Sequence, residues 1–123
     1  EAVAGNRVGD ISDAVQKKAE SGGYSVVRTL VGHGIGRNLH EGPEVPNFGK
    51  RGSGTRLERN LVICIEPMIN MGTKNTRVAA DGWTVSTGDG KPSAHYEYAV
   101  AVREGQPDQL TTFEYIEEVL TKR

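Results

Sequence analysis

Residues 31–43 have the sequence VGHGIGRNLHEGP, in which two histidines, His33 and His40, stand seven positions apart. Gly32 and Gly34 flank the first histidine in an apolar run, although each glycine weakens a strand and leaves no side chain to pack. Alternating glycines indicate a backbone that a ligand, an ion or another chain approaches closely. Histidine is a common metal ligand and acid–base group, so this stretch is a candidate site. A core histidine satisfied by backbone groups explains one such residue equally well, and further residues have to decide.

Length and composition favour a single domain, since the chain has 123 residues. Lys plus Arg number 15 and Asp plus Glu 16, so the net charge of −1 predicts binding to neither nucleic acid nor an anionic membrane. No apolar run approaches the roughly 20 residues of a spanning helix, and no signal peptide is visible. The single cysteine, Cys64, fits a reducing cytoplasm. The first residue, Glu1, is not an initiator methionine, which indicates a partial sequence.

Residues 10–21 predict an amphipathic helix. Asp10 is expected to be its N-cap, and the glycine pair that follows Ser21 is expected to end it. Ile11, Val15 and Ala19 recur at a spacing of four and form its apolar face.

Most of the remaining chain predicts strands separated by turns. The dipeptide Asp81-Gly82 is a strong hairpin signal, and Gly and Pro are frequent after His40. Strands are predicted at 24–31, 60–65, 77–80, 83–87 and 93–102, a surface loop at 41–55, and a short packed helix around 113–120. One helix followed by antiparallel strands indicates the α+β class.

Two carboxylates stand out in this pattern. Glu66 ends an apolar strand, where a charge is costly unless it is paired, hydrogen-bonded or bound to a metal; an ion pair with Arg37 or simple exposure are the alternatives. Glu97 falls within a predicted strand beside Ala99 and Ala101, whose small side chains leave space for a site. The solvated face of an edge strand would also accommodate Glu97.

Together these residues form a candidate metal site. The sequence H-E-x-x-H is excluded because Glu44 replaces its second histidine, and G-x-G-x-G differs from the dinucleotide motif. The residues that remain are His33, His40, Glu66 and Glu97. One imidazole and two carboxylates suit a divalent metal, with the second imidazole free to act on a substrate. A metal-bound water beside two carboxylates is a common arrangement for hydrolysis.

Three stretches carry a resemblance to a known family. They are GHGIGRNLHEGP at 32–43, IEPMIN at 65–70 and DGWTVSTGDGKPSAHYEYAVAV at 81–102. In these the chain resembles the methionine aminopeptidases of type I, which are pita-bread metallopeptidases. Met68 favours this group over relatives that cleave X-Pro bonds, and the short spacing between His40 and Glu66 leaves no room for the insertion of type II.

The resemblance implies half of a pita-bread fold, with a curved antiparallel sheet and a packed helix. It implies two divalent metal ions (Co, Mn, Fe or Zn) held by two aspartates, one histidine and two glutamates. His33 resembles the histidine ligand and Glu97 the glutamate that bridges both metals. Glu66 resembles a terminal ligand that is also the general base.

Three further residues resemble substrate-binding positions. His40 resembles the histidine that hydrogen-bonds the scissile amide, and Trp83 resembles a wall of the methionine pocket. Leu39 stands where many relatives have Phe, and Tyr98 where many have His. These two differences concern the shape of the pocket and the surroundings of the ligands, not the ligands themselves.

The aspartate ligands of the family lie before the helix that opens this chain, so residues 1–123 resemble the C-terminal half of the catalytic domain. The implied activity of the whole protein is removal of N-terminal methionine from peptides, with the missing N-terminal half as partner. This half alone is expected to bind metal weakly or not at all, to be inactive, and to self-associate through its uncovered surface. The alternative is a pita-bread module that has lost catalysis and only binds partners.

Overall fold

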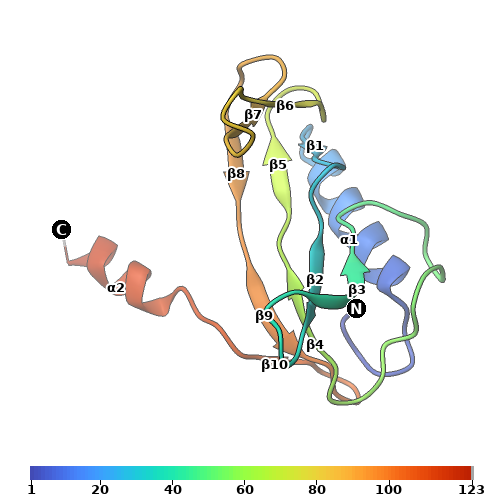
Figure 1. Ribbon diagram of the computed structural model, residues 1–123. Coiled ribbons are helices and arrows are strands. Elements are labelled where there is room, and N and C mark those ends of the chain that lie inside the picture. The colour runs from blue at the N-terminus through green and yellow to red at the C-terminus, as the bar shows by residue number, and fades with distance from the viewer. Residues whose placement is uncertain (123) are drawn as a thin grey trace.

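A computed structural model describes residues 1–122 and has two helices and ten strands in that range. The elements are α1 (Val8–Ser21), β1 (Ser25–Val26), β2 (Gly32–Ile35), β3 (Glu41–Val45), β4 (Val62–Ile65), β5 (Met68–Asn70), β6 (Thr76–Val78), β7 (Val85–Thr87), β8 (Ser93–His95), β9 (Tyr98–Ala101), β10 (Asp108–Gln109) and α2 (Glu114–Thr121). All strand pairs are antiparallel, and the sheet orders are β10-β9-β4-β2-β3, β1-β5-β8 and β6-β7. Helix α1 lies along one side of these strands (Figure 1). The predicted α+β class is confirmed.

Helix α1 begins two residues earlier than the sequence pattern predicts, and the prediction of Asp10 as its N-cap is wrong. Arg7 is the N-cap, and Asp10 is the third residue of the helix, in its first turn. The Asp10 carboxylate accepts hydrogen bonds from the backbone N–H groups of Arg7 at 2.7 Å and Gly52 at 2.9 Å. These two bonds lower the pKa of Asp10. The Asp10 side chain therefore caps the N-terminus of the helix from the third helical position, as in a capping box.

The hydrophobic core lies between α1 and the five-stranded sheet. Ile11 contributes the helix side, and Val15 is partly buried against the same cluster. The sheet side comes from Val45 and Ile63, both fully buried. Leu57, from the segment before β4, completes the cluster. The predicted apolar face of the helix is therefore the face that packs, and it supports the strands that carry the candidate site.

The glycine-rich stretch forms strand β2 itself, so the predicted strand at 24–31 is wrong in extent: only Ser25–Val26 is extended and paired. The predicted loop at 41–55 likewise begins with strand β3. A side chain on Gly32 would overlap the carbonyl oxygen of Cys64, and one on Gly34 the carbonyl oxygen of Gly42. The close approach that the glycines permit is therefore by neighbouring strand backbones, not by a ligand.

Replacing Gly32 with Ala is expected to destabilise the fold, because the added methyl group must displace the backbone of β4. Overpacking of this kind costs about 1–3 kcal/mol. The midpoint of urea unfolding should fall accordingly. Gly42→Ala is the control, since a Cβ there meets no atom within 4 Å. Equal midpoints for both variants would show that β2 and β4 do not pack this closely.

The predicted strand at 93–102 is divided in two, and the division positions the site. β8 pairs with β5 and β9 with β4, and the residues between them are Tyr96 and Glu97. On the neighbouring strand, Glu66 and Pro67 separate β4 from β5 in the same way. Proline has no N–H for the strand ladder, which explains an interruption at this point. Both carboxylates therefore lie at one junction, where β4 leads into β5 and β8 into β9 (Figure 1).

The predicted C-terminal helix is confirmed as α2, but its predicted packing is wrong. Ile116, Val119 and Leu120 are all exposed, and α2 projects away from the rest of the structure (Figure 1). The last aromatic contact is that of Phe113, whose ring centroid lies 5.1 Å from that of Tyr98. Beyond it, the sheet provides no surface for the helix. Within residues 1–122, neither helix is long and apolar enough to cross a membrane.

Candidate metal centre

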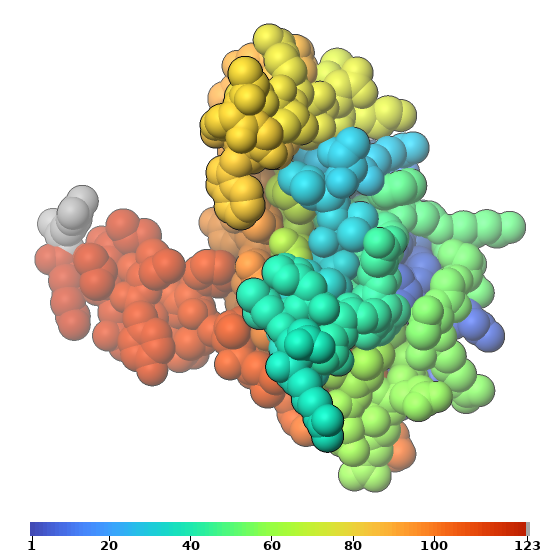
Figure 2. Space-filling view, in the orientation of Figure 1, coloured from blue at the N-terminus to red at the C-terminus, as the bar shows by residue number. Residues whose placement is uncertain are grey.

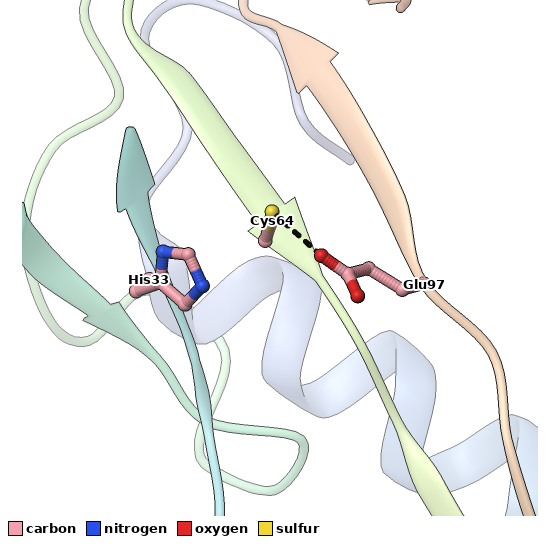
Figure 3. Close-up of side chains that lie close together, drawn as sticks. All are labelled: His33, Cys64 and Glu97. Atoms are coloured by element: carbon pink, nitrogen blue, oxygen red, sulfur yellow. Dashed lines mark hydrogen bonds between the residues drawn. The ribbon is translucent and has the colours of Figure 1, made fainter. Parts of the chain in front are cut away.

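Three adjacent strands bring the predicted ligands together. His33 comes from β2, Glu66 follows β4, and Glu97 precedes β9. Strand β4 pairs with both of the others, so the three side chains meet over neighbouring backbones. Figure 3 shows the imidazole of His33 and the carboxylate of Glu97 on either side of Cys64.

Each carboxylate oxygen of Glu66 faces an imidazole nitrogen. Oε1 lies 3.4 Å from His33 Nε2, and Oε2 lies 3.4 Å from His95 Nε2. The Glu66 side chain is only 15% exposed. Within residues 1–122 no Lys or Arg forms an ion pair with Glu66 or Glu97, so the alternative pairing of Glu66 with Arg37 is not observed.

The ring of His33 is held in a defined orientation. Its Nδ1 lies 2.9 Å from the carbonyl oxygen of Gly34. A carbonyl only accepts, so in the neutral ring Nδ1 carries the proton and Nε2 presents its lone pair to Glu66. The pairing of β2 with β3 shifts register between His33 and Gly34. Bulges of this kind redirect side chains near functional sites.

Cys64 is part of the site, although the sequence pattern did not single it out. Its buried thiol donates a hydrogen bond to Glu97 Oε1 at 3.1 Å. Burial, followed by this hydrogen bond and the charge of Glu97, raises the pKa of Cys64 to about 12. The thiol therefore remains protonated at neutral pH and orients the Glu97 carboxylate.

Cys64 is expected to resist alkylation in the folded chain. With a pKa of about 12, roughly one thiol in ten thousand is ionised at pH 8, and only the thiolate reacts. Iodoacetamide at pH 8 in the presence of EDTA should modify the native chain at least about a hundredfold more slowly than the chain in guanidinium. Mass spectrometry measures both rates. Similar rates would show that the thiol is neither buried nor protonated.

An open hollow of about 890 Å³ lies beside Glu66. Its lining residues are Leu30, Val31, His33, His40, Glu66, Met68, Val78, Gly82, Trp83, Thr84, Val85 and His95. The rings of His33 and His40 lie 4.2 Å apart, which places His40 beside a candidate ligand. Trp83 belongs to the lining but is 88% exposed, while Leu39 is exposed and outside the lining. In Figure 2 the hairpin β6–β7 and the turn before β3 project on either side of this face.

The donor atoms fit a divalent metal. Two sets of three ligand atoms, each within 4.8 Å of one another, come from His33, Cys64 and Glu97 and from Glu66, His95 and Glu97. The sets share Glu97, as a bridging carboxylate would require. Two carboxylates close together without a Lys or Arg partner need a cation to offset their charge. Imidazole and carboxylate ligands together suit Zn, Mn, Fe and Co.

His95 was missed as a site residue, although a signal was present. It lies two positions before Glu97 within the predicted strand at 93–102, and side chains two positions apart in a strand lie on the same face. Cys64 lies two positions before Glu66 in the same way. In both cases the alternation of side chains along a strand predicts that the residue two positions before a candidate ligand lies on the same face as that ligand.

The chain is similar to known proteins over most of its length. The methionine aminopeptidase of Clostridium perfringens is 55% identical over 106 residues, which cover 86% of this chain and 43% of that protein. Methionine aminopeptidase 1 of Bacillus subtilis is 46% identical over 111 residues, covering 90% of this chain and 45% of that protein. The crystal structure of methionine aminopeptidase from Thermotoga maritima superposes with a TM-score of 0.87 at 42% identity, covering 89% of this chain and 44% of that one.

The chain thus spans less than half the length of these relatives. The pita-bread fold implied by the sequence resemblance is confirmed for this part of the domain. Residues 1–104 match the profile of metallopeptidase family M24, which is most of the chain. The fold similarity and the profile match agree, and the chain belongs to metallopeptidase family M24.

Proposed function

We propose that the longer protein containing this chain removes N-terminal methionine from peptides in the cytoplasm by metal-dependent hydrolysis. One observation carries the proposal: Glu66 and Glu97 converge with His33. His33 and Glu66 line a hollow that is also lined by His40 and Trp83. The relatives named methionine aminopeptidase support the same reaction.

His33, Glu66 and Glu97 would hold the metal ions, with two aspartates supplied by sequence outside residues 1–123. When bound, divalent ions lower the pKa of water and polarise a carbonyl group. Residues 1–123 would then be the C-terminal half of the catalytic domain. This assignment is supported by the share of the relatives' length that the chain covers.

The side chains of this half suit distinct steps. The Glu66 carboxylate takes a proton from the attacking water, whose oxygen bonds to the carbonyl carbon of methionine. As the C–N bond breaks, that proton passes to the leaving nitrogen. His40 donates a hydrogen bond to the scissile amide as charge develops on it. The apolar lining of the hollow, with Trp83 at its rim, takes the methionine side chain.

A binding module without catalysis is less well supported. Loss of catalysis would release the ligand positions from selection, yet His33, Glu66 and Glu97 are all present and lie together. Such a module would bind peptides with N-terminal methionine and leave them intact.

The decisive assay compares the longer protein with this chain alone. With Co²⁺ or Mn²⁺ restored, the longer protein should release methionine from Met-Ala-Ser and leave Leu-Ala-Ser intact. Failure to cleave Met-Ala-Ser would overturn the proposed function.

Residues 1–123 alone are expected to release no measurable methionine, because two of the five implied ligands are outside them. Liquid chromatography of Met-Ala-Ser digests measures the product. Robust release by the purified chain would show that its own ligands suffice. The predicted self-association would appear as a dimer in sedimentation velocity.

A further inference from the structure

The third histidine of the chain, His95, has no part in the reaction proposed above. It ends strand β8 and pairs with Met68 of β5, directly before the junction that carries Glu97. Its Nε2 lies 3.4 Å from Glu66 Oε2, and its side chain is 47% exposed. The nitrogen is therefore directed at the carboxylates and remains accessible from the hollow.

The spacing of the donor atoms is that of ligands around an ion. A direct N–H···O hydrogen bond spans about 2.7–3.2 Å, which is shorter than the 3.4 Å between His95 and Glu66. Two ligands each about 2.1 Å from a tetrahedral ion are separated by about 3.4 Å. His33 lies at the same 3.4 Å from the other oxygen of Glu66. Each carboxylate oxygen of Glu66 therefore has an imidazole nitrogen at the distance expected between two ligands of one ion.

We infer that His95 is an additional metal ligand, which binds one divalent ion together with Glu66 and Glu97. The inference rests on the metal centre of the proposed function and adds a nitrogen donor to it. The three donor atoms lie within 4.8 Å of one another and come from neighbouring strands held in one register. An imidazole in this position favours Zn²⁺, Co²⁺ or Fe²⁺ over Mg²⁺ and Ca²⁺.

Histidine NMR tests the ligand assignment directly, because the chain has only three histidines. Because residues 1–123 alone are expected to bind metal weakly or not at all, long-range ¹H–¹⁵N spectra of the longer protein are recorded before and after two equivalents of Zn²⁺. Variants of His33, His40 and His95 assign the signals of these three residues. The Nε2 resonances of His33 and His95 should both move on zinc binding, while those of His40 stay in place. A change at His33 without one at His95 overturns the inference and leaves the metal centre intact. No change at either histidine overturns both.

Zinc affinity separates a ligand from a hydrogen-bond donor. His95→Gln keeps a donor for Glu66 but removes the imidazole nitrogen, and it should weaken Zn²⁺ binding by at least about tenfold in competition with a chromophoric chelator. Tyr96→Phe is the matched control: it changes the adjacent, exposed side chain and should leave the affinity unaltered. Backbone amide spectra verify that both variants are folded. Unchanged affinity in His95→Gln would assign His95 to hydrogen bonding and overturn the inference.

Discussion

Glu97→Gln in the longer protein is expected to abolish both metal binding and methionine release. Glu97 belongs to both groups of ligand atoms, so its loss removes a donor from each. The amide keeps an oxygen that can accept the Cys64 thiol, but it has no charge to offset a cation. A metal ion contributes several kcal/mol to such a reaction, so kcat/KM should fall by at least roughly a thousandfold.

Metal analysis of the dialysed variant and hydrolysis of Met-Ala-Ser measure the two effects. Glu104→Gln is the matched control, because it makes the same chemical change at an exposed position away from the ligands. Retention of two ions by Glu97→Gln would exclude a bridging role for this carboxylate.

His40→Ala is expected to separate the two properties: metal binding persists while turnover falls. His40 lines the hollow but belongs to neither ligand group. Removing a hydrogen bond that acts on the reacting amide costs about 10²–10³ in kcat. KM should change less, because the interaction strengthens as the reaction proceeds.

The ring of His40 also contacts that of His33 at 4.2 Å, so the alanine variant removes a packing neighbour of a ligand. His40→Gln restores bulk and a donor, and it should recover part of the lost rate with the metal content of the unaltered protein. Equal loss of metal in His40→Ala and Glu97→Gln would show that His40 is a ligand instead.

Local patterns in the sequence were sufficient for the strand before Glu66, for the hairpin at Asp81-Gly82 and for the first helix. The apolar run before Glu66 became strand β4, and Asp81-Gly82 lies in the hairpin β6–β7. Helix α1 followed from the spacing of its apolar residues. In each case the signal lies within a few neighbouring residues, which a sequence displays directly.

The errors arose where distant segments decide the outcome. Gly32 is extended because β3 and β4 pair with β2 on both sides, and that pairing is not visible in residues 31–43 alone. The position of the Asp10 side chain depends on a hydrogen bond from the backbone N–H of Gly52, which is distant in sequence, as well as on one from Arg7. For the site, strand alternation placed His95 beside Glu97, but only the pairing of β8 with β5 brings it to Glu66.

The paired interruption at Glu66-Pro67 and Tyr96-Glu97 has a consequence for folding. Its register is defined by the flanking pairs Ile65↔Tyr98 and Met68↔His95. A slip of one residue would turn one strand's side chains to the opposite face and separate the carboxylates. If the proposed metal centre forms, an ion that needs both carboxylates would bind the native pairing and not the slipped one. By mass action it would stabilise only the correctly paired sheet, and the ion would therefore favour the native strand alignment over competing ones during folding.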